Sequence, residues 1–203
     1  MRALLVGCFG FAGTLARYWL QGAAQRLTSS TFPYGTLAVN VLGSFVVGFV
    51  ATLTLERAAL NPTWRAAILV GFCGGFTTYS AFAYETFELL RTGDPWRGIA
   101  NVAAQLALGI AAVWLGYAAA IVSRAREEGL AGATVLRGLM GFGAASRIHT
   151  AKVLRLSEDL PIVVEIVDRS EKIEAFLPAL DEMVGDGLMT LERVQVVTYR
   201  AKS

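Results

Sequence analysis

The chain has 203 residues, of which 55% are hydrophobic and 17% are charged, and its mean hydropathy is +0.52. A soluble domain of this length fills its core with a smaller apolar fraction, so the composition favours a membrane protein over a soluble one. The formal net charge is only +2 and the basic residues are spread along the chain, which excludes the concentrated positive surface of a nucleic-acid-binding protein.

Four apolar stretches approach the roughly 20 residues that a helix needs to cross a hydrocarbon core. They cover residues 3–21, 34–55, 66–90 and 99–122. The first begins like a secretory signal, but Arg17 interrupts it and no clean small-residue cleavage site follows, so we expect a retained span. The sequence therefore predicts a four-helix, multi-pass protein of the plasma or inner membrane.

The arginines of the loops give almost no preference for one orientation in the membrane. If the N-terminus is cytoplasmic, five arginines face that side and four face the other. The first group is Arg2, Arg57, Arg65, Arg124 and Arg126, and the second is Arg17, Arg26, Arg91 and Arg97. Such a chain can insert both ways and pair with itself as an antiparallel dimer. A four-span protein that is simply poorly biased is an equally good interpretation.

The second stretch carries one amide, Asn40, near the middle of an apolar span. A polar side chain at this depth is costly unless it faces a partner or an aqueous path, so Asn40 is a candidate site residue whose NH2 group can donate to an anion. The alternative is an interhelical hydrogen bond that only stabilises the bundle. Position alone does not separate these two roles.

The third stretch contains "VGFCGGFTTYSAF", which places glycine and hydroxyl residues in the middle of a membrane span. These residues are Gly71, Gly74, Gly75, Thr77, Thr78 and Ser80. A helix that breaks here frees carbonyl oxygens, which suit a small hard cation, and irregular backbone in a membrane survives only where protein or water covers it. The alternative is close helix packing through small residues.

The composition changes after residue 122, where "SRAREEG" opens a segment that holds most of the acidic residues. The sequence therefore predicts two domains, residues 1–123 and 124–203. In the second, apolar and β-branched runs predict strands at 134–143, 160–168 and 193–200. Asp168 and Glu171 have the spacing of a capping box for a helix that Gly185 would end, so this domain is predicted to be α+β.

Three segments of the first domain resemble the signature segments of the Fluc, or CrcB, fluoride channels. They are "GTLAR" at 13–17, "GTLAVNVLGSF" at 35–45 and "GFCGGFTTYSAF" at 71–82, and the resemblance extends over about residues 1–123. It implies a chain of four transmembrane helices with a broken third helix. It also implies an antiparallel dimer with two pores around a central, structural sodium ion.

The resemblance also implies residue roles. The backbone carbonyls of Gly74 and Thr77 would be sodium ligands, two from each subunit. The fluoride path would pass Asn40, the Ser80 hydroxyl and two aromatic rings, whose positive edges can attract a small anion.

Those rings match Tyr79 and Phe82, although the family usually has Phe at the first of these positions. Arg17 matches an arginine that would draw anions into the vestibule, and the alternative is a snorkelling interfacial side chain. On the fourth span, Asn101 and Gln105 share a helix face with Gly109, where the family tends to have hydroxyl residues.

The function implied by the resemblance is a passive, fluoride-selective ion channel with no enzyme activity. Its partners would be fluoride, membrane lipid and a second copy of the chain, with no nucleic acid. One alternative is a four-span proton-coupled exporter, which would need a carboxylate deep in the membrane, and the first span has none. Another is a membrane anchor for a signalling domain, which the intact broken-helix motif argues against.

The segment "GATVLRGLMGFGAASRIHTAKVLRLSEDLPIVVEIVD" at 132–168 resembles an uncharacterised family related to the PII signalling proteins, which have a ferredoxin-like βαββαβ fold. Here the fourth span runs straight into "SRAREEGLAG", so the first strand of that fold is missing and the sheet is expected to be incomplete. An unprotected sheet edge needs another chain or element to cover it. Either the extension has lost its ancestral role, or it biases insertion and the channel needs an oppositely oriented second protein.

Overall fold

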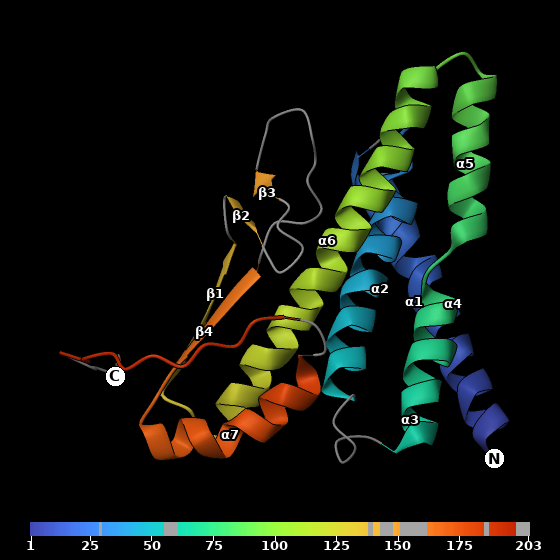
Figure 1. Ribbon diagram of the computed structural model, residues 1–203. Coiled ribbons are helices and arrows are strands. Elements are labelled where there is room, and N and C mark those ends of the chain that lie inside the picture. The colour runs from blue at the N-terminus through green and yellow to red at the C-terminus, as the bar shows by residue number, and fades with distance from the viewer. Residues whose placement is uncertain are drawn as a thin grey trace.

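The computed structural model describes residues 1–28, 30–54, 61–137, 140–142, 148–150, 162–184 and 187–197. For the described residues between 137 and 150 it describes the backbone alone. A bundle of long apolar helices is followed by a small α+β unit (Figure 1). Helices α1 (Arg2–Thr28), α2 (Tyr34–Leu53) and α6 (Pro95–Glu127) are continuous, whereas the third span, Pro62–Arg91, is divided. The predicted helical membrane fold is confirmed.

The third span consists of two half-helices. The first half comprises α3 (Pro62–Ala66), the π-helix η1 (Ala67–Cys73) and α4 (Gly74–Phe76), and the second half is α5 (Tyr79–Arg91). The Asn61 side chain accepts a bond from the Thr63 N–H at 2.8 Å, and Pro62 occupies the first helical position, so this start is well capped. Thr77 and Thr78 lie between the two halves and belong to neither helix, so the predicted break is present.

Glycines set the distance between α2 and α6. A Cβ on Gly116 would lie 2.7 Å from the Phe49 backbone nitrogen, and a Cβ on Gly48 would meet the Val113 carbonyl. Small residues at a helix contact let the two backbones approach closely, which is how membrane helices associate in the absence of a hydrophobic driving force. The fourth span therefore packs tightly on the second.

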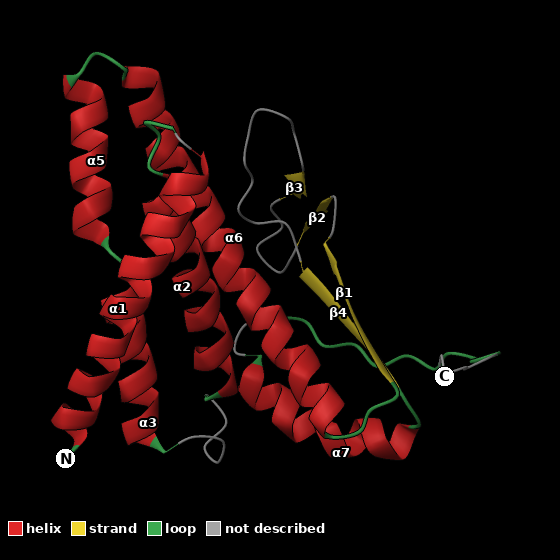
Figure 2. Cartoon of the chain, turned by 180° about the vertical axis from the view of Figure 1, so that it is seen from behind, coloured by secondary structure: helices red, strands yellow, loops and turns green. Residues whose placement is uncertain are grey.

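The second unit contains two short antiparallel pairs of strands and one helix. Strand β1 (Gly132–Arg137) pairs with β4 (Ile162–Val167), and β2 (Met140–Phe142) pairs with β3 (Ile148–Thr150). Helix α7 (Ser170–Met183) follows, and the β1–β4 pair lies beside the C-terminal half of α6 (Figure 2). The predicted strand at 160–168 and the predicted helix are present, whereas the segment expected as one strand at 134–143 contributes to two strands, β1 and β2, which belong to different sheets.

The core of the second unit is built on the last turns of the fourth span. Ala120 and Ile121 of α6 are fully buried with Met183 of α7. The side chains that pack against this cluster are Phe49, Leu53, Tyr117, Val164, Ile166, Leu180 and Val184. Helix α6 thus belongs to both units, and the expected boundary between residues 123 and 124 falls inside it.

Two local predictions for the second unit are wrong. The cap of α7 is Arg169, without a side-chain bond, because Asp168 instead accepts bonds from the backbone N–H groups of Arg169 at 2.7 Å and Ala131 at 2.8 Å. The strand expected at 193–200 is not formed in the described residues 193–197, which pair with none of the described strands. Residues 198–200 and Gly185 lie outside the described residues.

Candidate functional site

The break in the third span lies at Thr77 and Thr78. Both have extended backbone, with φ −89° and ψ 162° for Thr77 and φ −150° and ψ 112° for Thr78. The Thr77 N–H still bonds the Cys73 carbonyl at 2.9 Å, so the first half of the span keeps its ladder to the last residue. Two residues of irregular backbone therefore sit between two helices at mid-membrane and need polar partners from elsewhere.

Asn40 of α2 supplies those partners. Its Oδ1 accepts the Thr78 N–H at 2.8 Å, and its Nδ2 donates to the Thr78 carbonyl at 3.1 Å. The same Nδ2 donates to Oε1 of Gln105 on α6, also at 3.1 Å. Asn40 is thus an interhelical link, and its amide already bonds two neighbouring helices.

Gln105 is a site residue whose role the sequence did not reveal. Its Oε1 is held by Asn40, whereas its Nε2 is buried and has no partner in the part of the chain that the structure describes. The spacing placed Gln105 on one face with Asn101, but Asn101 bonds Thr86 of α5 at 2.9 Å and lies outside this contact. The Gln105 Nε2 group lies beside the break and can still donate a hydrogen bond to a ligand.

The side chains of Thr78 and Arg17 also bond backbone groups at the break. The Thr78 hydroxyl accepts the Ala81 N–H at 3.2 Å and so caps α5, and it lies 3.4 Å from the Ser80 hydroxyl. Nη1 of Arg17 on α1 donates to the Thr77 carbonyl at 3.2 Å. Arg17 therefore reaches the break itself rather than the membrane surface.

The glycines of the third span divide between the two roles that the sequence left open. A Cβ on Gly71 would lie 2.6 Å from the Val6 carbonyl oxygen, and a Cβ on Gly75 would meet the Gly10 carbonyl, so these two pack against α1. Gly74 differs, because a Cβ there would find nothing within 4 Å. Its carbonyl has also lost its usual helical donor, since the Thr78 N–H bonds Asn40. The Gly74 carbonyl oxygen is therefore a candidate ligand for a small hard cation.

The two aromatic rings of the motif form an edge-to-face pair. The ring centroids of Tyr79 and Phe82 are 5.7 Å apart with an interplanar angle of 63°. Tyr79 is 79% exposed, so it faces out of this chain, whereas Phe82 is half-buried. The structure thus brings Asn40, Ser80 and both rings to one region around the break.

A cavity of about 670 Å³ opens near the other end of α5. Its lining includes Gln21, Gln25, Glu85 and Glu88, and Arg17 does not line it. Glu85 accepts a 2.6 Å bond from the Thr36 hydroxyl, which in turn accepts from Gln21 at 3.0 Å. This cavity, called the vestibule below, therefore has two carboxylates among its lining residues.

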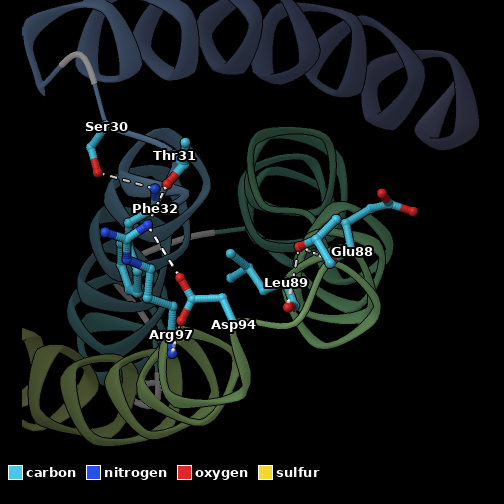
Figure 3. A network of polar contacts seen from close by, with 8 residues as sticks. Ser30, Thr31, Phe32, Glu88, Leu89, Asp94 and Arg97 are labelled. Atoms are coloured by element: carbon cyan, nitrogen blue, oxygen red, sulfur yellow. Dashed lines mark hydrogen bonds and ion pairs between the residues drawn. The ribbon is translucent and has the colours of Figure 1, made fainter.

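The turn beside this cavity is fixed by side-chain contacts (Figure 3). Arg97 donates to the Thr31 hydroxyl at 2.7 Å and pairs with Asp94 at 3.2 Å. Asp94 also caps α6 by accepting the Arg97 N–H. The connection between α1 and α2 is thus tied to the start of α6, which holds the mouth of the vestibule in shape.

Comparisons with known proteins match the two parts of the chain to two different families. Residues 4–117 match the family described as CrcB-like protein, camphor resistance (CrcB). Residues 116–196 match DUF190, described as an uncharacterized ACR, so the two matches meet within α6. The resemblance noted in the sequence is confirmed for both parts.

Several relatives carry the same name. The fluoride-specific ion channel FluC of Solibacter usitatus is 47% identical over 116 residues, which are 57% of this chain and 95% of that one. FluC of Geobacter sulfurreducens is 42% identical over 117 residues, 58% of this chain and 94% of that one. FluC of Methylococcus capsulatus is 42% identical over 137 residues, 67% of this chain and 59% of that one.

Four helices of the described chain are long and apolar enough to cross a membrane. With these relatives, they identify a multi-pass protein of the cell membrane. The CrcB match covers more than half of the sequence and includes Arg17, Asn40, the break and Gln105. The chain belongs to the CrcB family.

Proposed function

We propose that this protein is a fluoride-specific ion channel that lets cytoplasmic fluoride leave passively, and that it has no enzyme activity. The observation that carries the proposal is the match of the membrane unit to nearly the whole length of FluC, at 47% identity in one case. The choice of fluoride among anions rests on those relatives. The break in the third span supports a conduction path, because irregular backbone at this depth needs protein or water around it.

In this proposal the fluoride path passes the ring edges of Tyr79 and Phe82 and the hydroxyl of Ser80. The edge-to-face geometry of the two rings supports this role, since one ring edge is available at a partly exposed surface. Asn40 holds the Thr78 backbone at the narrow part of the path, and the unpaired amide of Gln105 supplies the nearby donor. Neutral donors bind an anion weakly enough to let it leave.

The working unit in this proposal is an antiparallel homodimer that holds one structural sodium ion. The carbonyls of Gly74 and Thr77 would hold the ion, two from each subunit, because two oxygens from one chain do not complete a coordination shell. The open surface at Gly74 supports this assignment. When bound, the ion supplies a fixed positive charge that offsets the cost of an anion in a low-dielectric path.

Fluoride efflux from liposomes tests the function. Purified full-length protein in potassium-loaded liposomes is expected to release fluoride, with chloride-loaded and protein-free liposomes as controls. Efflux needs only the fluoride gradient and a potassium ionophore. Chloride release at a similar rate would remove the proposed selectivity, and a strict need for a proton gradient would favour the coupled exporter instead.

Reporter fusions test the assembly. A reporter that is active only in the cytoplasm and one that is active only outside it are attached in turn to the C-terminus, and both are expected to give signal in a dual-topology homodimer. The near-balanced arginine content supports this expectation. Signal from only one reporter would show a single orientation and would require a second, oppositely oriented protein.

A further inference from the structure

We propose that Arg17 acts at the break of the third span, as a positioning residue that holds the Thr77 carbonyl and neutralises the end of the first half-helix. This role differs from the vestibule role that the sequence suggested. The inference rests on the proposed channel function for its flux readout, but its structural readout is independent of that function.

The depth of Arg17 in the membrane is the first step. The guanidinium of Arg17 bonds the carbonyl of Thr77, which lies midway along the third span, Pro62–Arg91, so the charged group reaches the middle of that membrane segment. Arg17 is half-buried and lines no part of the vestibule cavity, which is walled by Glu85 and Glu88. A cationic side chain this far inside an apolar span is costly without a polar partner.

The partner of Arg17 is a backbone carbonyl. Nη1 lies 3.2 Å from the Thr77 oxygen, and among the described residues no carboxylate pairs with Arg17. In an unbroken helix this oxygen would accept the Ala81 N–H, but that group bonds the Thr78 hydroxyl. Arg17 thus replaces the hydrogen bond that the break removes, as Asn40 does one residue later.

The charge of Arg17 matters as well as its hydrogen bond. The half-helix from Pro62 to Phe76 ends beside Thr77, and a helix C-terminus carries about −0.5 of an elementary charge. Unopposed, this negative end would lie next to the proposed anion path at Ser80. The Thr77 oxygen has two lone pairs, so it can accept from Arg17 and also face the proposed sodium ion. The two cations together offset the negative end and leave the positive N-terminal end of α5 as the dominant dipole there.

Three variants of the full chain separate the two roles. Arg17→Gln removes the charge and shortens the donor, so that it no longer reaches the Thr77 carbonyl, and Arg17→Lys keeps the charge and the reach without the planar fork. Arg2→Gln removes a charge from the exposed start of the same helix. Fluoride efflux is measured over a series of fluoride concentrations and at two ionic strengths. We expect Arg17→Gln to lower the maximal rate at least about tenfold with an unchanged half-saturating concentration, Arg17→Lys to restore part of it, and Arg2→Gln to match wild type.

The opposite pattern would overturn the proposal. An anion-attracting vestibule residue raises the local fluoride concentration, so its loss would raise the half-saturating concentration, preserve the maximal rate and weaken at high salt. A Gln variant that conducts as well as wild type would also contradict the charge role.

Hydrogen–deuterium exchange gives the readout that does not need flux. Backbone amides of residues 76–82 are expected to exchange about tenfold faster in Arg17→Gln than in wild type or Arg2→Gln, and the Lys variant is expected to lie between them. If wild type conducts no fluoride but this exchange pattern is found, the channel function fails and the positioning role stands. Exchange at the break that is unchanged in both Arg17 variants would refute the positioning role, even if Arg17→Gln fails to conduct.

Discussion

The third and fourth spans of this bundle contain the same number of glycines, yet only one of them is broken. The third has Gly71, Gly74 and Gly75, and α6 has Gly98, Gly109 and Gly116. In α6 the ladder continues through all of them, because each faces a helix contact or space and no side chain competes for the backbone. In the third span the ladder stops at Thr77, where Asn40 and Arg17 bond the freed groups.

The difference teaches that glycine permits a break in a membrane helix but does not produce one. A freed N–H or carbonyl in hydrocarbon costs free energy unless a partner replaces the lost bond. Three partners replace the lost bonds at this break: Asn40 bonds the Thr78 N–H and carbonyl, the Thr78 hydroxyl accepts the Ala81 N–H, and Arg17 donates to the Thr77 carbonyl. Side chains from two other helices therefore define where the third span opens.

Loss of the hydrogen bonds that Asn40 makes to Thr78 and Gln105 should reduce fluoride efflux more than any other substitution proposed. In Asn40→Asp the carboxylate can still accept the Thr78 N–H, but its second oxygen faces the Thr78 carbonyl and Gln105 Oε1. Two buried acceptors without donors cost about 1–3 kcal/mol each, so we expect fluoride efflux to fall about a hundredfold or more. The matched control is Asn61→Asp, which keeps a good cap on α3 and should conduct normally. An Asn40→Asp channel that conducts like wild type would show that Asn40 only packs.

The adjacent glycines Gly74 and Gly75 should respond in opposite ways. In Gly75→Ala the new Cβ meets the Gly10 carbonyl and lies 3.1 Å from the Thr14 hydroxyl, so the free energy of unfolding should fall by about 1–3 kcal/mol. Gly74→Ala meets nothing within 4 Å, and the chain should remain as stable as wild type. Thermal unfolding in detergent measures both. Equal destabilisation of the two would remove the distinction between packing and open glycines.

Gly74 also separates folding from assembly. If its surface faces a second subunit, a large residue there keeps the monomer folded but prevents the carbonyls from converging. We expect Gly74→Val to lose fluoride efflux and sodium-dependent dimer stability together, as measured by flux and by light scattering at several sodium concentrations. A dimer that keeps its sodium dependence in this variant would contradict the proposed ion site.

The fourth span offers a test at its far end, in the core of the second unit. Met183 is 1% exposed against Ala120 and Ile121, so Met183→Ala should destabilise that unit by about 2–5 kcal/mol. Met189→Ala, at a residue that is 43% exposed, serves as the control. Limited proteolysis measures the local effect, and fluoride efflux should change less than about twofold because, among the described membrane helices, the Met183 cluster contacts only the last turns of α2 and the C-terminal part of α6, away from the break. A large loss of efflux would show that the second unit supports the channel.

The smallest effect is expected at Asp168, which ties the end of α6 to α7. The backbone N–H of Arg169 lowers the pKa of this carboxyl, and the Ala131 N–H and Lys172 act in the same direction. A lowered folded-state pKa stabilises the charged form above the ordinary value of about 4, and the gain is lost as the pH falls through the lowered pKa. Asp168→Asn should therefore speed amide exchange in β4 and α7 at pH 7, and its effect should shrink as the pH falls below the ordinary value for a carboxyl group. The exposed Asp181→Asn is the control, and a difference that is independent of pH would exclude this linkage.

The sequence predicted elements better than it predicted contacts. Apolar run length located all four spans, and the Gly-Thr pattern located the break, because both signals are local. The partners of Asn40 could not be predicted, since Thr78 and Gln105 are far away in sequence and meet only in the packed bundle. Arg17 was placed near the end of a span because helix α1 continues through polar residues to Thr28, and hydropathy does not record that continuation.

The continuity of α6 joins the two units with a fixed angle as well as a fixed distance. A helix turns by about 100° for each residue, so one residue inserted between Gly116 and Ala120 would rotate the Ile121–Met183 core by that angle around the bundle. A fusion of two proteins through a loop tolerates any length of junction, whereas a fusion through a helix tolerates only lengths near whole turns. The junction of this chain is therefore expected to accept insertions of seven residues, close to two turns, far better than insertions of two or five.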